Sequence, residues 1–561
     1  MFIMNYCYTR VPIYMKNILN EVRAENRPHI IFEETAYALF FSAFTAYCMF
    51  QMRQLIIGAS RHIEYKLRKE LFNKLIYQDF SFFAKNKTGD LISRCTNDLD
   101  QVRVLLGPGI MYLPNSISRL ILFAPILISL NFKLSVALFI LITILILMII
   151  FIMPLTKPLH KAIQEHIGSI NDRVWQVLSG IHTIKLYTRE RIEEKRFKSL
   201  NREYIKRNMK SEAVQAFLWP FFMTLFGATE LLIIGIGGRE VILGNMSLGE
   251  LLQFKVMIAI LAFPVLSLGW VMSVLQQGIS AMERIELILN SKQEKQVDAG
   301  KQVKPDNAHI ELKNLNFNYP DHEQATLKNI NLSIQPGEVV GITGPVGSGK
   351  STLISLITGT LQPKRGELFI GGVDVLDIAP EDHYSLFAYV PQNTFLFSNT
   401  IENNVALYHL DASNEIKEDD RKLVEKVSKL AALDKDVQTF KNDYREVVGE
   451  KGVTLSGGQK QRVSIARALF KNVELLIFDD ALSAVDADTE KEILDHIKQL
   501  SLTHSMIIVS HRISSMRFTD RVYYLDKGSI AEHGSHEELL QHGGHYANIA
   551  KLQQLKNEVQ A

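Results

Sequence analysis

The stretch Gly341–Thr352, GITGPVGSGKST, decides the fold of the second half of the chain. It follows the apolar run Val339–Ile342 and precedes the helix-like run Leu353–Ile357, so the expected order is strand, loop, helix. Backbone N–H groups of such a glycine-rich loop and the positive end of the next helix form a site for phosphate groups. Lys350 adds a positive charge for the β- and γ-phosphates, and Ser351 adds a hydroxyl for Mg²⁺. The pattern G-x-x-x-x-G-K-[ST] therefore predicts that the chain binds a nucleoside triphosphate. The candidate binding residues in this loop are Gly344, Pro345, Val346, Gly347, Ser348, Gly349, Lys350, Ser351 and Thr352.

Length and composition limit the class of protein. A chain of 561 residues is too long for a single hydrophobic core, so at least two domains are expected. The net charge of +2 argues against a nucleic-acid-binding protein with a basic face, and we expect no nucleic-acid partner. The cysteines Cys7, Cys48 and Cys95 lie far apart, and their spacing indicates neither a disulfide framework nor a zinc site.

Almost all long hydrophobic runs lie in Met1–Gln277, which is typical of a membrane protein. Five of these runs are long enough to cross roughly 30 Å of hydrocarbon as helices. A sixth run, Met1–Leu19, contains Arg10, Pro12 and Lys16, and we expect it to be only the last part of a span, from a late start site or a shortened gene. The five predicted spans are Ile30–Ile57, Ile110–Leu130, Leu134–Pro154, Val214–Gly238 and Leu251–Leu275.

The distribution of Lys and Arg between the spans predicts their orientation. Arg61–Arg103 and Lys157–Lys210 contain nine and thirteen basic residues, whereas the connections Asn131–Lys133 and Arg239–Gly249 contain one each. Because basic segments stay on the cytoplasmic side, the two long segments are expected in the cytosol. The sequence thus predicts a multi-pass integral membrane protein, with the lipid bilayer as one of its partners.

Two ionisable residues, Arg119 and Glu230, lie several turns from the nearest predicted loop. An ionisable group at that depth is unfavourable unless it faces a cavity or a partner. Either side chain could line a transport path. Each could equally be buried against a neighbouring helix or lie near the interface.

The chain after the spans changes character. Residues 290–308 are polar and without periodicity, which indicates a linker. From residue 309, strand patterns alternate with helix patterns through the phosphate loop and the apolar runs that follow it. We therefore expect an all-α transmembrane helical bundle at 1–289, a linker at 290–308, and an α/β nucleotide-binding domain at 309–561.

Two further motifs in the second domain suit nucleotide chemistry. The apolar run Leu475–Phe478 ends in Asp479 and Asp480, which places one carboxylate to hold Mg²⁺ and the next beside the attacking water. Leu455–Gln459, LSGGQ, precedes a helix-like run, and its serine and glycines would lie at the positive end of that helix. One domain thus carries two phosphate-binding loops for one nucleotide. A head-to-tail dimer, in which each domain closes the site of the other, explains this arrangement.

In type, order and spacing these motifs resemble the ATP-binding cassette (ABC) family. The further matches are Gln392 in YVPQ, Ser483–Asp486 as SAVD, and His511 in SHR. Tyr319 lies where that family places an aromatic ring against adenine, and Asp486 and the signature residues are implied to contact nucleotide. With spans and cassette in one chain, the sequence resembles a bacterial multidrug-type exporter half. The implied signature residues are Leu455, Ser456, Gly457, Gly458 and Gln459.

The resemblance implies ATP and Mg²⁺ as cofactors and a place in the bacterial inner membrane, with the ATPase domain in the cytoplasm. Its implied metal ligands are Ser351, Gln392 and Asp479, and its implied catalytic residues are Asp480, His511 and Gln392. Thr88–Arg103 and Leu178–Glu190 look like its coupling segments, and VVGEKG before the signature looks like a segment that touches intracellular loops. The implied substrate is an amphipathic or hydrophobic small molecule.

One departure from the family pattern concerns the catalytic base, which is usually glutamate and here is Asp480. The shorter side chain predicts slow hydrolysis, because a general base must come within about 2.6–3.2 Å of the proton it accepts. A weak base beside an intact signature favours a heterodimer with a second exporter half over a homodimer. A homodimeric lipid flippase and an ATP-gated channel or regulatory subunit remain alternatives.

Overall fold

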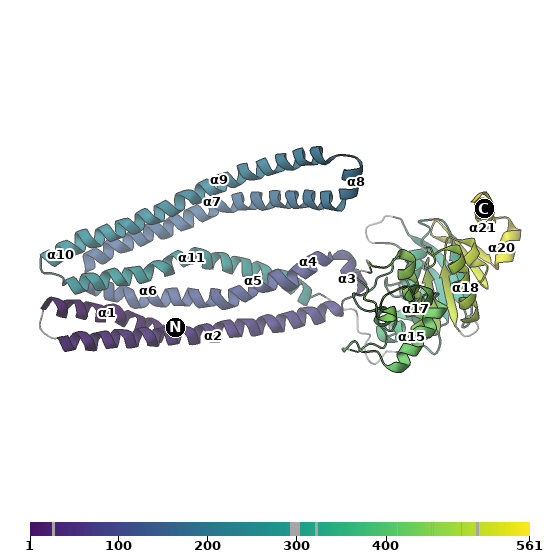
Figure 1. Cartoon of the computed structure of the whole chain (residues 1–561), viewed down its shortest axis with the longest axis horizontal. Coiled ribbons are helices and arrows are strands. Elements are labelled where there is room, and N and C mark those ends of the chain that lie inside the picture. The colour runs from purple at the N-terminus through teal and green to yellow at the C-terminus, as the bar shows by residue number, and fades with distance from the viewer. Residues whose placement is uncertain are drawn as a thin grey trace. The chain divides into compact units, whose positions relative to one another are not determined.

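The chain forms two compact units, Met1–Ile76 with Thr88–Ser291, and Tyr77–Lys87 with Lys292–Ala561 (Figure 1). The computed structural model describes all residues except 25–27, 292–302, 320–323, 412, 450–451, 453, 484, 501–503 and 561. Most of the expected linker and part of the VVGEKG segment lie outside the described residues. The division at 1–289, 290–308 and 309–561 stays a prediction.

The first unit consists of long helices joined by short turns. Within the described residues, three helical stretches are long and apolar enough to cross a membrane: Thr88–Leu130, Pro220–Ile242 and Leu248–Leu289. In Figure 1, α7 and α9 run side by side and are joined by the short α8. The elements of this unit are α1 (Phe2–Ala24), α2 (Pro28–Ile76), α4 (Thr88–Ser93), η1 (Arg94–Asp98), α5 (Leu99–Val104), η2 (Leu105–Gly109), α6 (Ile110–Leu130), α7 (Phe132–Ser179), α8 (Ile181–Leu186), α9 (Glu190–Leu232), η3 (Ile233–Gly237), α10 (Gly238–Ile242) and α11 (Leu248–Leu289).

Side-chain caps begin the helices that follow the two short, weakly basic connections. The Asn131 side chain accepts a hydrogen bond from the Leu134 N–H at 3.0 Å and so begins α7. Ser247 begins α11 through a capping box with Glu250, in which each side chain accepts the other residue's N–H. These caps satisfy N–H groups that would otherwise be unpaired at the helix starts.

The start of the chain is helical. Met1–Leu19, predicted to be the last part of a span, lies in the helix Phe2–Ala24, which continues through Pro12. Neighbouring helices stabilise it, since Met4 and Cys7 of α1 are buried and Asn5 is completely buried. Proline is tolerated in membrane helices when adjacent groups satisfy the freed backbone.

The second unit is built around a six-stranded sheet with the order β10-β9-β3-β8-β7-β6. Alternate residues of its strands enter two different hydrophobic cores. Val339 and Leu476 lie in the core shared with α17 and α18, whereas Val340 and Ile477 lie in the core shared with α12. The strands are β3 (Val339–Thr343), β6 (Phe387–Val390), β7 (Leu475–Asp479), β8 (Ser505–Val509), β9 (Arg521–Asp526) and β10 (Ser529–Gly534).

A second, antiparallel sheet with the order β2-β1-β4-β5 covers the α12 side of the unit. The α/β fold class expected from the sequence is confirmed, but this separate antiparallel layer was not foreseen. Its strands are β1 (Ile310–Phe317), β2 (Leu327–Ile334), β4 (Leu368–Ile370) and β5 (Val373–Asp374). The helices of the second unit are α3 (Phe80–Lys85), α12 (Lys350–Ile357), η4 (Val375–Asp377), α13 (Pro380–Ser385), α14 (Ile401–Val405), α15 (Glu418–Leu430), α16 (Asp434–Val437), η5 (Asp443–Arg445), α17 (Gly457–Phe470), α18 (Ala487–Leu500), α19 (Ile513–Met516), α20 (His536–His542) and α21 (His545–Gln560).

Candidate nucleotide site

The central feature of the candidate site is one edge of the large sheet. Strands β3, β8, β7 and β6 are parallel neighbours, so their carboxyl ends meet at that edge. The phosphate loop Gly344–Ser351 follows β3, and His511 follows β8. Asp479 and Asp480 stand at the end of β7, and Gln392 follows β6. Four segments far apart in the sequence thus deliver their candidate residues to one place.

The glycines of the phosphate loop are required by its backbone. Gly344 has φ = +145°, and a Cβ there would lie 2.1 Å from the Leu525 carbonyl oxygen. Gly349 has φ = +101°, and its Cβ would lie 2.6 Å from a methyl group of Leu327. Other residues rarely adopt these conformations, and the neighbouring atoms leave no room for a side chain. The loop is therefore held in a shape in which backbone N–H groups can face an anion.

Lys350 begins α12 and is buried, with 6% of its surface exposed. Its Nζ donates to the carbonyl oxygens of Gly344 at 2.9 Å and Pro345 at 2.8 Å. Burial lowers the pKa of Lys350, and the carboxylates of Asp479 and Asp480 oppose that shift. The ammonium group is thus bound to carbonyl oxygens of the phosphate loop itself, and it interacts with the carboxylates of Asp479 and Asp480.

Asp479 is buried and accepts a hydrogen bond from the Tyr389 hydroxyl at 3.1 Å. Burial raises the pKa of the Asp479 carboxyl, and the Tyr389 hydrogen bond opposes this shift, as do the charges of Lys350 and His511. Ser351, the second residue of α12, follows Lys350 and carries a hydroxyl of the kind that Mg²⁺ accepts as a ligand. The donor set expected for Mg²⁺, one hydroxyl, one amide and one carboxylate, fits that cation.

Asp480 has a positive φ of 48° and donates its backbone N–H to the Val509 carbonyl oxygen at 2.9 Å. Aspartate is among the residues that tolerate the left-handed conformation. The Gln392 side-chain amide donates to the Asp480 carboxylate at 3.4 Å. The structure therefore brings the expected base and the expected glutamine together at the sheet edge.

Tyr319 lies beside the phosphate loop. Its hydroxyl is 3.3 Å from the Thr352 hydroxyl, and its ring meets Phe317 edge to face at 5.2 Å between centroids. The ring is thus held next to the first turn of α12. Contact of Tyr319 with adenine stays a prediction.

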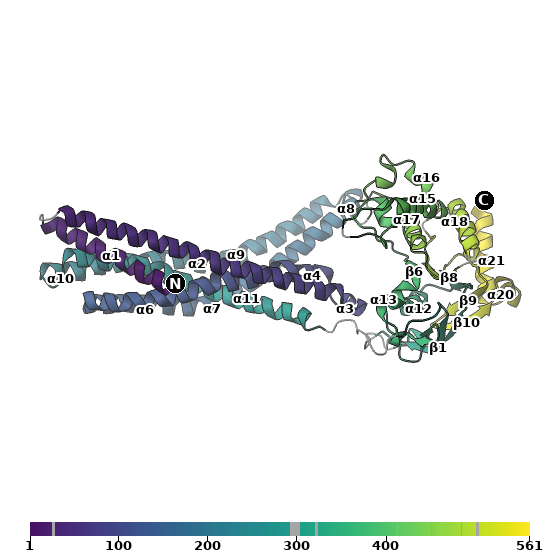
Figure 2. The same ribbon diagram turned by 90° about the horizontal axis from the view of Figure 1, so that it is seen from below.

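The signature residues form the start of α17. Ser456 caps the helix, and Ser456 and Gln459 make a reciprocal capping box, with bonds of 2.9 and 3.3 Å. Gln459 and Arg462 also donate to the Asp436 carboxylate. Helices α17 and α12 contribute to opposite hydrophobic cores and appear on different sides of β6 in Figure 2. Leu455, Gly457, Gly458 and Gln459 accordingly belong to a different face from the phosphate loop.

Asp486 precedes α18, and its carboxylate accepts the Thr489 N–H at 3.0 Å. That hydrogen bond lowers the pKa of Asp486 and keeps it ionised. The residue therefore caps a helix, and a contact with nucleotide stays a prediction. Tyr389 is the site residue that the sequence reasoning missed, although it lies in the same YVPQ motif as Gln392.

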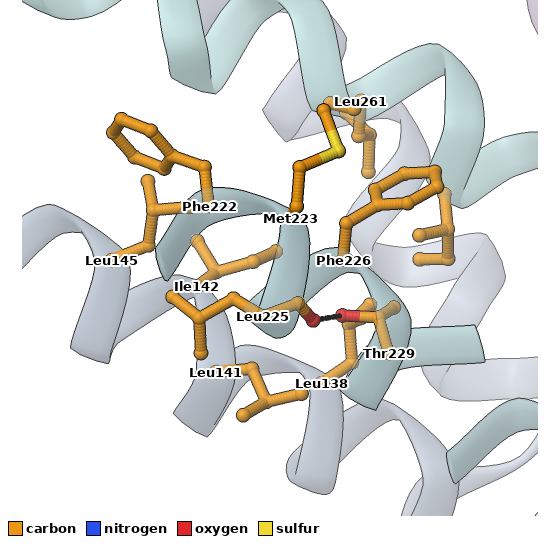
Figure 3. Close-up of a pocket in the computed structure, with 12 residues that line it drawn as sticks. Leu138, Leu141, Ile142, Leu145, Phe222, Met223, Leu225, Phe226, Thr229 and Leu261 are labelled. Carbon is orange, nitrogen blue, oxygen red and sulfur yellow. Dashed lines mark hydrogen bonds between the residues drawn. The ribbon is translucent and has the colours of Figure 1, made fainter. Parts of the chain in front are cut away.

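The first unit contains an apolar pocket of about 140 Å³ between α7, α9 and α11 (Figure 3). Among the described lining residues Thr229 alone has a polar side chain, and its hydroxyl donates to the Leu225 carbonyl oxygen at 2.9 Å. The described lining therefore offers an occupant mainly hydrocarbon and aromatic surface. The labelled residues include Leu138, Leu141, Ile142, Leu145, Phe222, Met223, Phe226 and Leu261.

Comparisons with known proteins match both units. Residues 6–265 match the family model "ABC transporter transmembrane region", and residues 327–483 match "ABC transporter". The multidrug resistance-like ATP-binding protein MdlA of Escherichia coli is 34% identical over 90% of this chain and 84% of its own length. The probable multidrug resistance ABC transporter protein YheI of Bacillus subtilis is 33% identical over 90% and 86%.

Two other similar proteins broaden this comparison. An ATP-dependent lipid A-core flippase of Psychrobacter arcticus is 31% identical over 87% of this chain and 81% of its own length. A solved bacterial Atm1-family ABC exporter with ATP bound superposes with a TM-score of 0.80, at 25% identity over 99% of this chain and 96% of that one. The similarity therefore extends over both units and includes drug-type and lipid-type transporters.

Proposed function

Because this chain belongs to the ABC transporter family, as an exporter chain with a transmembrane region and an ATPase domain, we propose that it exports amphipathic or hydrophobic small molecules as one half of a dimeric exporter. It is an ATP-hydrolysing membrane transporter with its ATPase domain on the cytoplasmic side. The observation that carries the finer proposal is the separation of its phosphate loop from its signature helix.

Dimer formation follows from that separation. The phosphate loop begins α12 on one face of the sheet, and the signature begins α17 on the other. One chain therefore cannot close both loops on the same nucleotide. A partner in head-to-tail arrangement supplies the missing signature to each site.

The site built on this chain's own phosphate loop hydrolyses ATP slowly in this proposal. Asp480 holds the position of the general base, with Gln392 bonded to its carboxylate. An aspartate reaches roughly 1–1.5 Å less far than a glutamate, because it lacks one C–C bond length of side chain. Slow hydrolysis at one site and an intact signature favour a heterodimer, in which this chain's signature serves a faster site on the partner.

Ser351, Gln392 and Asp479 would hold Mg²⁺ at the same edge in this proposal, and the bound ion would neutralise charge on the phosphates. The chain's own groups do the rest. Lys350 leaves the carbonyl oxygens that it now contacts and pairs with phosphate oxygens, and Asp480 accepts a proton from water. His511, whose charge already acts on Asp479, stands beside the γ-phosphate position.

ATP binding drives the transport step by favouring the closed pair of ATPase domains. Shifting a 1:99 equilibrium to 99:1 requires about 5.5 kcal/mol of preferential binding, which two phosphate-binding loops on one nucleotide can supply. The segment around α8 is suited to transmit the movement, since Leu186 and Tyr187 there are 82% and 72% exposed. The substrate is apolar in part, because the described lining of the pocket between α7, α9 and α11 is apolar apart from Thr229.

Two measurements test this proposal. The full-length chain, alone and with a candidate partner half, is reconstituted in lipid vesicles, and accumulation of a hydrophobic dye against its gradient is followed with and without ATP. We expect ATP-dependent accumulation only with the partner present and only with Lys350 intact, Lys350→Ala being the control. Passive flux alone would indicate a channel. An ordinary ATPase rate for the chain alone would indicate a homodimeric transporter of the flippase type.

A further inference from the structure

Two ionisable side chains of the membrane unit, Glu230 and Arg119, have different surroundings. Glu230 forms an ion pair with Lys255 of α11 at 2.9 Å, so its charge is compensated. Arg119 donates from Nε to the Asn5 side-chain oxygen at 3.0 Å, and its guanidinium lies 5.1 Å above the Tyr8 ring. Within the described residues Arg119 has no acidic partner, and its two Nη groups have no acceptor.

Arg119 is deep in the bilayer. It lies twelve residues before the Asn131 turn, which corresponds to about 18 Å along the helix axis. Half the hydrocarbon thickness is roughly 15 Å, so this guanidinium lies near the membrane centre. Charged residues at such depth are rare, face the interior or a water-filled cavity, and mark substrate pathways.

The orientation of α6 directs Arg119 inward. The exposed isoleucines of this helix form one stripe at positions 110, 117, 121 and 128. At 3.6 residues per turn, Arg119 is about 160–180° around the helix from every member of that stripe. The side chain therefore points away from the apolar outer surface and toward the other helices of the unit.

A buried network fixes the position of the guanidinium. Asn5 is fully buried and donates to the Asn115 side-chain oxygen at 2.8 Å and the Ser118 hydroxyl at 2.5 Å. The side-chain NH₂ of Asn5 donates both of these bonds, and its oxygen accepts the bond from Arg119 Nε. The two Nη groups of Arg119 therefore have no acceptor among the described residues. These groups are the part of arginine that binds carboxylate or phosphate with two parallel hydrogen bonds.

We propose that Arg119 binds the phosphate or carboxylate group of an anionic amphiphile inside the membrane unit. The inference rests on the proposed exporter function and specifies its substrate class. Desolvated charge-assisted hydrogen bonds are the strong ones, so the anion is selected over a cationic amphiphile of equal chain length. The apolar tail needs only hydrocarbon contact, which the surrounding helices provide.

Binding of dodecyl phosphate to the full-length transporter in phosphatidylcholine nanodiscs, without ATP, tests the proposal. We expect saturable binding at least about tenfold tighter than that of dodecyltrimethylammonium, since charged hydrogen bonds of this kind change affinity by that order. Arg119→Gln should remove the preference, and Arg119→Lys should retain only part of it. Lys133→Gln, which removes a positive charge at the 77% exposed Lys133, should leave binding unchanged.

The source of the anion is distinguished by adding phosphatidylglycerol to the nanodiscs. Competition in the wild type but not in Arg119→Gln assigns the site to a bilayer lipid, and absence of competition assigns it to a free amphiphile. Equal affinity of the wild type for the anionic and cationic probes overturns the proposal, even if a variant fails to fold. Because binding is measured without ATP, a failure of transport would count against the exporter function and leave this inference standing.

Discussion

Replacing Asp480 by glutamate should speed ATP hydrolysis at this chain's site. The carboxylate is 3.4 Å from the Gln392 amide nitrogen and follows the buried strand β7, so its direction is fixed by the sheet. One added methylene extends it by roughly 1–1.5 Å. General-base assistance contributes about 10²–10⁴-fold, equivalent to roughly 3–5 kcal/mol of barrier, which sets the upper limit of the gain.

The same substitution should cost stability. Asp480 has φ = 48°, and a residue other than glycine, asparagine or aspartate in that conformation costs about 1–2 kcal/mol. We therefore expect Asp480→Glu to hydrolyse faster and to melt at a lower temperature. Aspartate-to-asparagine replacement tolerates the same backbone and removes the base, so it is the matched control and should be slower than wild type.

The assay is phosphate release by the full-length chain assembled with its partner half in nanodiscs at saturating ATP, with nucleotide affinity and melting temperature measured on the same samples. If the glutamate variant binds ATP normally and stays folded, yet hydrolyses ATP no faster than wild type, the shorter side chain of Asp480 does not limit the rate. An asparagine variant as fast as wild type would show that Asp480 is not the base.

Three further changes test other parts of the second unit. Lys350→Ala should weaken ATP binding by tenfold or more, as measured by equilibrium binding of a fluorescent nucleotide, because a charged hydrogen bond contributes about 1.5–3 kcal/mol; unchanged affinity would contradict the placement of Lys350. Tyr389→Phe removes the hydrogen bond that opposes the raised pKa of Asp479, so Mg²⁺-dependent ATP binding should be lost at a higher pH on acidification than in wild type; superimposable pH profiles would exclude this role. Burial lowers the pKa of His383 from 6.5 to about 4, which makes the native state bind fewer protons than the unfolded state between these values. The free energy of unfolding should therefore fall by up to roughly 3 kcal/mol as the pH drops from 6.5 to about 4. In denaturant titrations, His383→Gln should make the free energy of unfolding less dependent on pH; an equally steep dependence in the variant would contradict this role of His383.

Much of the nucleotide site was predictable because its residues come directly after the ends of buried strands in the sequence. A buried apolar run followed by GxxxxGKS or by two aspartates has few structural alternatives, and the structure brings Lys350, Asp480 and Gln392 to one edge. Asp479 was predicted in the same way. The roles of these residues in catalysis and metal binding stay predictions.

Other features depend on contacts between residues that lie far apart in the sequence, and the pattern of residues along the chain does not reveal such contacts. The Glu230 partner, Lys255, lies on a different helix, and spacing along the chain gives no sign of their pairing. Asn5 and Arg119 are separated by more than a hundred residues, and their network requires α1 to cross α6 at one level. The antiparallel layer was not foreseen, although β2 (LKNINLSI) intersperses polar and apolar residues, as antiparallel strands do, whereas the parallel strands are continuous apolar runs.

The membership of Tyr77–Lys87 in the second unit has a practical consequence. This stretch includes α3, which Asp79 begins by accepting the Phe82 N–H. An ATPase domain excised at Lys292 would leave these eleven residues of the second unit on the other fragment. The second unit is therefore discontinuous in the sequence, and we expect an ATPase domain that lacks Tyr77–Lys87 to be less stable than the same domain in the full chain.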